Sequence, residues 1–265
     1  MNNSQNNIYV VLDTETTGLK YEDGEQIIEI GAVKLQNNNN IIDRYHTYIK
    51  PKDNKEVSKT AIDVHGITNE FLQDKPLFTE IVNDFLDFIN DATCIICHNA
   101  EFDINFINYQ LKELDTKTIK TECVIDTMRL AMKLLPNKKY SLDNLCKIYK
   151  IDASSRIKHG ALIDAELTAK LFFSLYDDLR NKINNFPEDM KTIDFYEEID
   201  LEYWTDIAQS DIIRSINDML SICKICKLLD YLDNSDKLEM FLNEVPKFQI
   251  FANCLYNDDN KGITI

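Results

Sequence analysis

Long hydrophobic runs, a secretion signal and a disulfide pattern are all absent from this sequence. None of its 265 residues lies in an apolar stretch of 18 or more, so we expect no transmembrane helix. The first seven residues, MNNSQNN, are polar and lack the basic-then-apolar order of a signal peptide. The seven cysteines are odd in number and scattered, which favours free thiols in a reducing compartment. We therefore expect a cytoplasmic protein without a membrane partner.

Basic residues are also scarce. The chain has 29 Lys and Arg against 45 Asp and Glu, for a formal net charge of −16. Non-specific binding to nucleic acid depends on Lys and Arg displacing counterions, so the composition disfavours such a binder. Residues 187–265 hold 17 acidic and 7 basic residues, which is most of the imbalance. This asymmetry indicates two regions with different partners.

Two Cys-x-x-Cys pairs, at 94–97 and 223–226, resemble the halves of a zinc site. The first pair lies in a predicted strand, where residues three apart point to opposite faces. The second pair lies on an apolar helical stripe. Core packing is therefore the favoured interpretation of both pairs.

The order of apolar segments predicts an α/β fold. Strand-like runs at 8–13, 26–35 and 41–49 come first, and helical periodicity follows at 77–91. Short strands at 93–99 and 122–127 then alternate with helices at 101–114, 128–135, 142–151 and 161–183. Asp126 and Ser141 are predicted to be helix N-caps. Pro187 marks the boundary between a first domain, 1–186, and a second region, 187–265.

Two acidic residues follow the apolar run of the first predicted strand. Asp13 and Glu15, in VVLDTETTGL, are two positions apart and therefore share one face of the strand. At about 5 Å and an effective dielectric of about 20, two carboxylates repel by about 3 kcal/mol. A structural ion pair is the commoner explanation of such a pattern, and a bound metal cation is the alternative.

Further candidate residues lie where predicted helices begin. Asp103, in HNAEFDINF, follows a buried strand and opens a helix, where a carboxylate also suits the helix dipole. His159 and Asp164, in RIKHGALIDAELTAKL, straddle the start of the longest predicted helix. Gly160 is expected to give that loop the freedom to orient the imidazole. Asp164 is surrounded by apolar residues, so it faces either solvent or a metal.

These motifs together resemble the DEDDh family of 3′–5′ exonucleases, and within it the proofreading exonucleases of bacterial replication. The matching blocks, in the family order over residues 8–178, are LDTETTGL, VHGITNEFLQDKP, HNAEFDINF, YSLDNLC and HGALIDAELTAKL. The resemblance implies a ribonuclease-H-like mixed sheet flanked by helices. It also implies that the four acids are Asp13, Glu15, Asp103 and Asp164, with His159 as the histidine.

The resemblance further implies two bound Mg²⁺ or Mn²⁺ ions, which prefer oxygen ligands. Asp13 would bridge the ions, Glu15 and Asp164 would complete the two sites, and Asp103 would ligate one ion directly or through water. His159 would accept the proton of the attacking water. The expected reaction is hydrolysis of DNA from the 3′ end to nucleoside 5′-monophosphates.

Candidate contacts to the end of the nucleic acid come from two segments. The backbone at Thr14 and Thr16 is expected to hold the terminal sugar. His65 is interpreted either as a histidine that caps its own loop or, by the resemblance, as a contact to the terminal nucleotide. Thr60 stands where relatives often present an acid to the 3′ hydroxyl, which is a departure from the family pattern.

Basic residues near His159 are candidate contacts to the nucleic-acid backbone. Arg156 and Lys158 flank His159 and are expected to meet phosphates. Lys138 and Lys139 are weaker candidates, since a solvated turn is the favoured interpretation.

Several functions stay open at this point. The first is a DNA exonuclease that proofreads, repairs or trims single-stranded 3′ ends. The second is an RNA 3′–5′ exonuclease of the same superfamily, although DTETTGL resembles the DNA-acting branch more closely. The same core also serves as a nuclease module in antiviral systems. A catalytically silent interaction module is disfavoured because the five-residue set is intact.

Residues 187–265 match no motif of the family. Their apolar residues have helical spacing, and their charge is strongly acidic. In the proofreading exonucleases a tail tethers the enzyme to its polymerase. We expect residues 187–265 to form a small helical region that binds a protein partner.

Overall fold

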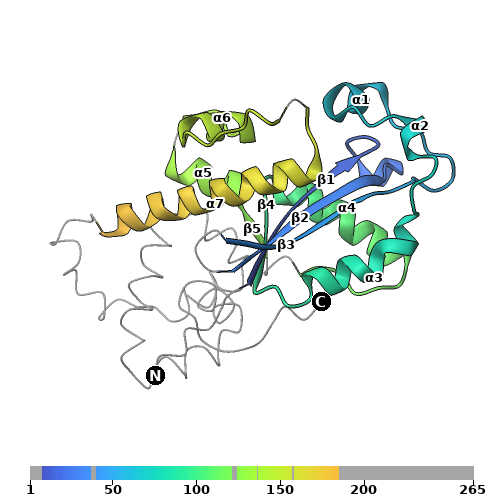
Figure 1. Cartoon of the computed structure of the whole chain (residues 1–265), viewed down its shortest axis with the longest axis horizontal. Helices are drawn as coiled ribbons and strands as arrows, with labels where there is room; N and C mark the ends of the chain where they lie inside the picture. The colour runs from blue at the N-terminus through green and yellow to red at the C-terminus, as the bar shows by residue number, and fades with distance from the viewer. Residues whose placement is uncertain (1–7, 37–39, 121–123, 136, 157, 185–265) are drawn as a thin grey trace, which may run out of the picture.

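A five-stranded mixed sheet forms the centre of the molecule, as the sequence predicts. The computed structural model describes residues 8–36, 40–120, 124–135, 137–156 and 158–184 (Figure 1). The strands are β1 (Ile8–Thr16), β2 (Ile27–Gln36), β3 (Asn40–Tyr48), β4 (Cys94–Cys97) and β5 (Val124–Asp126). Their order is β3-β2-β1-β4-β5. The first three strands pair antiparallel, whereas β4 and β5 continue the sheet in parallel from β1.

Helices cover both faces of the sheet. They are the 3₁₀ turn η1 (Tyr21–Asp23), α1 (Lys59–His65), α2 (Asn69–Leu72), α3 (Phe78–Ile89), α4 (Ala100–Glu113), α5 (Thr127–Leu134), α6 (Leu142–Ile148) and α7 (Ala161–Asn184). In Figure 1, α7 lies across the sheet with α5 and α6 beside it, and α3 and α4 lie on the opposite side. The α/β prediction is confirmed, whereas α1 and α2 were not predicted.

The alternation of β1 divides the core between the two faces. Val10 and Leu12 pack into the cluster that contains α3 and α4, whereas Val11 packs into the cluster that contains α7. Cys94 and Cys97 also belong to opposite clusters, and both are buried free thiols. The prediction that this pair packs into the core, with the two side chains on opposite faces of the sheet, is therefore confirmed. The second pair, at 223–226, lies outside the described residues.

Helix α7 approaches β2 unusually closely, and a glycine makes the contact possible. A Cβ atom on Gly31 would lie 2.1 Å from the amide nitrogen of Leu162 and 2.2 Å from the carbonyl carbon of Ala161. Any side chain would therefore push the first turn of α7 away from the sheet. Because Asp164 lies in that turn, Gly31 helps to fix the distance between Asp164 and the strands.

Asp126 organises the starts of two helices. Its carboxylate accepts hydrogen bonds from the amides of Met128 and Arg129 in α5, and also from those of Asn99 and Ala100 at the start of α4. The N-cap prediction for Asp126 is confirmed. Ser141 also occupies an N-cap position, but its side chain makes no capping hydrogen bond there.

No helix within the described ranges is long and apolar enough to cross a membrane. The acidic region 187–265 lies outside those ranges, so its predicted helices and its role as a separate domain stay predictions.

Candidate active site

The central strand β1 carries two of the candidate acids. Asp13 and Glu15 both lie within β1, which extends three residues beyond the predicted segment 8–13. Glu15 is buried, and Asp13 is partly exposed. The register between β1 and β2 shifts directly after Glu15, as a β-bulge would cause. The pair therefore lies near the end of the strand where the regular ladder is interrupted.

Helix α4 brings the third acid to the same place. Asp103 lies in the first turn of α4 and is buried. Its Oδ1 atom accepts hydrogen bonds from the Thr14 amide, at 2.9 Å, and from the Thr14 hydroxyl, at 2.7 Å. These two bonds tie α4 to the segment of β1 between Asp13 and Glu15.

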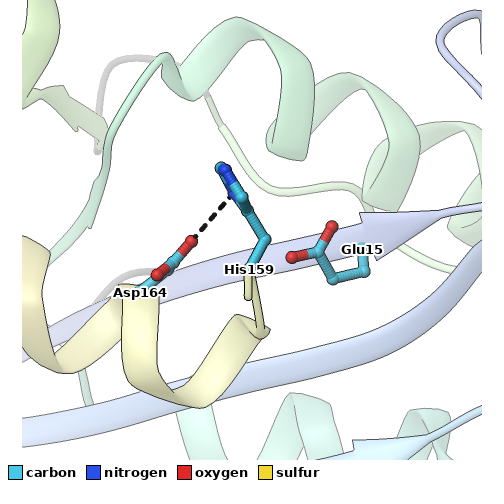
Figure 2. A group of neighbouring side chains, drawn as sticks. All are labelled: Glu15, His159 and Asp164. Atoms are coloured by element: carbon cyan, nitrogen blue, oxygen red, sulfur yellow. Dashed lines mark ion pairs between the residues drawn. The ribbon is translucent and has the colours of Figure 1, made fainter. Parts of the chain in front are cut away.

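Helix α7 and the loop before it supply the remaining two residues. One carboxylate oxygen of Glu15, one of Asp164 and a ring nitrogen of His159 all lie within 4.8 Å of one another. Figure 2 shows His159 between the two acids, with its ring turned toward Asp164. The His159 Nδ1 atom lies 3.3 Å from Asp164 Oδ2. The His159 side chain is 47% exposed, whereas that of Asp164 is 3% exposed.

Burial and mutual repulsion disfavour the ionised forms of three of the acids. Burial, followed by the charge of Glu29, raises the pKa of Glu15 to about 8. Burial and the neighbouring carboxylates, Asp103 first, raise the pKa of Asp13 well above its ordinary value. Burial also raises the pKa of Asp103 to about 7, although the hydrogen bonds from Thr14 favour its ionised form. A cation at this position would remove the repulsion.

Asp164 behaves differently because it already has a cationic partner. Burial alone would raise its pKa, but hydrogen bonds from His159 and Arg156 and the charge of Arg156 hold the pKa below the ordinary value. The Arg156 Nη2 atom lies 2.6 Å from Asp164 Oδ2, and Arg156 Nε is bonded to the other oxygen. Asp164 is therefore ionised in this structure.

The structure adds Glu29, a buried acid that the sequence analysis did not identify. Glu29 lies on β2 directly opposite Glu15 in the strand register and is 3% exposed. Its Oε1 atom lies 2.7 Å from the Nε2 atom of His46 on β3. The signal was available, since an acid interrupts the apolar run IIEIGAV.

The predicted contacts to the terminal nucleotide lie on two segments. The Thr14 amide is already bonded to Asp103, and the Thr16 hydroxyl donates to the Gly18 carbonyl at 2.6 Å. His65 ends α1 and is buried; its Nδ1 atom accepts from the Ile67 amide at 3.0 Å, while its Nε2 atom has no hydrogen-bond partner among the described residues. The capping interpretation of His65 therefore accounts for one nitrogen, and the other is buried.

Thr60 and the basic residues make contacts of their own. Thr60 is exposed on α1, and its hydroxyl lies 3.2 Å from that of Ser58. Lys158 is exposed, and its side chain lies over Gly66 at the end of α1. Arg156 is turned toward acids: its side chain is 6% exposed and bonded to Asp164 and Asp143. In this arrangement Arg156 does not face solvent, where a phosphate would lie.

The backbone freedom expected of Gly160 is not used. Gly160 does not adopt a positive φ, and no heavy atom lies within 4 Å of a Cβ built on it. Another residue would fit there, so the orientation of His159 comes from its neighbours and not from glycine at position 160.

Comparison with known sequences places this arrangement in a family. Residues 10–172 match the family model described as Exonuclease (RNase_T). A Rickettsia typhi protein named DNA polymerase III subunit epsilon is 45% identical over 188 residues, which cover 66% of this chain and 81% of that protein. The Salmonella typhimurium protein of the same name is 44% identical over 173 residues, with 63% of this chain and 70% of that protein covered.

Solved structures agree with the family. Exonuclease X, solved in complex with 5′ overhanging duplex DNA, is similar at 26% identity and a TM-score of 0.50, covering 64% of this chain and 91% of that one. The nuclease domain of 3′hExo, described as a DEDDh family member bound to rAMP, has 20% identity and a TM-score of 0.57 over 66% of this chain and 94% of that one, which supports the fold. The chain therefore belongs to the exonuclease family, as a divalent-metal-dependent 3′–5′ exonuclease of the DEDDh type related to the proofreading subunit of bacterial DNA polymerase III.

Proposed function

We propose that this protein removes nucleotides from the 3′ ends of single-stranded DNA by two-metal catalysis, as a proofreading exonuclease in the cytoplasm. The observation that carries the proposal is the approach of Glu15 on β1 to Asp164 and His159 at the start of α7. Asp103 on α4 lies beside them, hydrogen-bonded to Thr14 of the same strand. Relatives at about 45% identity named as subunits of a DNA polymerase support DNA over RNA as the substrate.

The donor set fits two hard divalent cations. Every acid in the group offers oxygen atoms, which Mg²⁺ and Mn²⁺ prefer. Glu15 Oε1 is buried and has no hydrogen-bond partner among the described residues, so it is free to ligate a metal. Burial, followed by the charge of Glu29, raises the pKa of Glu15 to about 8, and a cation beside the carboxylate would favour its ionised form. We assign Asp13, Glu15, Asp103 and Asp164 as metal ligands.

Two Mg²⁺ or Mn²⁺ ions bound there would lower the pKa of a water molecule and stabilise the departing 3′ oxygen. The chain supplies the rest of the chemistry. His159, whose Nδ1 atom lies 3.3 Å from Asp164 Oδ2, is assigned as the base that accepts the proton of the attacking water. Thr14 holds Asp103 in place through two hydrogen bonds. We assign the backbone at Thr14 and Thr16 and the side chain of His65, which is buried at the end of α1, to the binding of the terminal nucleotide.

Degradation of matched oligonucleotides tests the substrate assignment. A DNA 12-mer and an RNA 12-mer of the same sequence, incubated with the protein and Mg²⁺, should be degraded at different rates, with DNA faster. The control is an Asp13→Asn variant, which should degrade neither. Faster degradation of RNA would contradict the proposal and favour the alternative of an RNA exonuclease.

We also propose that residues 187–265 tether the enzyme to a protein partner. A chain of net charge −16 has few cations with which to hold DNA, and tethering raises effective concentration without new DNA contacts. The fragment 1–186 should retain most of its activity on an 8-mer but lose partner binding in a pull-down. An inactive but folded fragment would contradict the division into domains.

A further inference from the structure

Arg156 places a buried positive charge beside the four candidate acids of the active site, Asp13, Glu15, Asp103 and Asp164. Its Nε and Nη2 atoms bond the two oxygens of Asp164, and its Nη1 atom bonds Asp143 in the first turn of α6. Nη2 also lies 2.8 Å from the Nδ1 atom of His159 and 3.3 Å from its Nε2 atom. The Arg156 side chain is 6% exposed. One guanidinium therefore holds both the acid of α7 and the ring edge of His159.

We propose that Arg156 is a positioning residue that holds Asp164 and His159 in the metal-free enzyme and must release Asp164 before a metal can bind there. The planar guanidinium matches both carboxylate oxygens at once. With Arg156 in place, each oxygen of Asp164 already accepts a guanidinium hydrogen bond, and a positive charge lies where a metal ion would bind. Arg156 and the metal are therefore competitors for the same carboxylate, and this inference rests on the metal dependence proposed above.

Asp143 gives the guanidinium a second partner outside the metal group. The Asp143 side chain is 55% exposed, whereas that of Asp164 is 3% exposed. Asp143 comes from α6 and is not among the residues whose ligand atoms converge with Glu15. A guanidinium that leaves Asp164 can therefore keep its bond to Asp143 and remain charged and paired, which lowers the cost of the exchange.

Competition makes stability and metal affinity change in opposite directions. Removing Arg156 leaves Asp164 buried among other acids without a partner, which destabilises the metal-free protein. The same change frees both oxygens of Asp164, which strengthens metal binding. A residue with a merely structural role would lower both quantities, because a loosened site binds metal less well.

The test measures Mn²⁺ binding by calorimetry and thermal unfolding in EDTA, both on the full chain. The variants are Arg156→Gln, which removes the charge, and Arg156→Lys, which keeps the charge but replaces the two-pronged donor by one ammonium group. The control is Arg44→Ala. Arg44, on β3, pairs at 2.7 Å with Glu166, which lies on α7 like Asp164, but the Arg44 side chain is half exposed and contacts none of the proposed metal ligands.

For Arg156→Gln we expect the dissociation constant for Mn²⁺ to fall by about fivefold or more, while the unfolding temperature in EDTA falls by about 4 °C or more. Arg156→Lys should fold and give an intermediate affinity, and Arg44→Ala should match the wild type. If the wild type binds Mn²⁺ and neither Arg156 variant binds it more tightly, the competition is refuted and the metal dependence stands. If the wild type binds no Mn²⁺, both are refuted.

Discussion

Replacing Gly31 by alanine tests whether the close approach of α7 to β2 sets the geometry of the active site. The added Cβ would lie 2.1 Å from a backbone nitrogen of α7, and ordinary contact begins at 3.4 Å. The first turn of α7 must therefore retreat by about 1.3 Å. Because the nearest atoms are backbone atoms, no rotamer change can relieve the contact.

The retreat would carry Asp164 away from Glu15. A displacement of about 1 Å in an active site can cost on the order of 10² in rate, and overpacking of a core costs about 1–3 kcal/mol of stability. We expect Gly31→Ala to remain folded, with its rate of nucleotide release from single-stranded DNA in Mg²⁺ lowered by about a hundredfold. A single-turnover assay and thermal unfolding measure the two effects.

Gly160→Ala is the matched control. Gly160 directly precedes α7, but a Cβ on it would meet no heavy atom within 4 Å. We expect Gly160→Ala to keep its rate within about threefold of the wild type, since the added methyl group would meet no neighbouring atom. A Gly31→Ala variant that folds and cleaves as fast as this control would refute the reasoning.

Three further predictions concern the acids and the base. Asp13→Asn should lower the rate by more than about a hundredfold yet raise the unfolding temperature in EDTA, because it removes one charge from a repulsive group; a lower unfolding temperature would count against the repulsion. His159→Ala should lower kcat by about 10²–10⁴ with little change in metal affinity, and a near-wild-type rate would mean that another group is the base. In EDTA the folded protein should lose stability as the pH rises from about 5 to about 8, because Glu15 and Asp103, with pKa values of about 8 and about 7, keep protons that the unfolded chain has released. Urea unfolding at pH 5.5 and pH 8 measures the change, and a rise in stability would contradict it.

The strands of the sheet have a local signal in the sequence, and so do the positions of the acids. The apolar run before Asp13 and Glu15 predicts a buried strand that ends in polar residues. The structure confirms the strand. Asp126 was predicted as an N-cap because a carboxylate before a helix satisfies free amides, and it caps α5. Helix α1 was missed because it is only seven residues long, although Ser58 and Gly66 mark its two ends.

Long-range contacts had no comparable signal. Arg156 lies near His159 in the sequence and is predicted to face phosphates. Its ion pairs with Asp164 and Asp143 depend instead on how the loop before α7 lies against α6. Glu29 faces Glu15 only because of the register between β1 and β2. The need for glycine at position 31 likewise arises from a helix more than a hundred residues later.

The direction and metal dependence of cleavage test the proposed chemistry most directly. A single-stranded DNA oligonucleotide labelled at its 5′ end should shorten one nucleotide at a time in Mg²⁺ and release nucleoside 5′-monophosphates. It should stay intact in EDTA. The Asp103→Asn variant should also leave it intact in Mg²⁺, because the substitution replaces the carboxylate that Thr14 holds in place and that we assign as a metal ligand. Loss of the 5′ label in the first turnover, internal cuts, or equal rates with and without EDTA would contradict a metal-dependent 3′–5′ exonuclease.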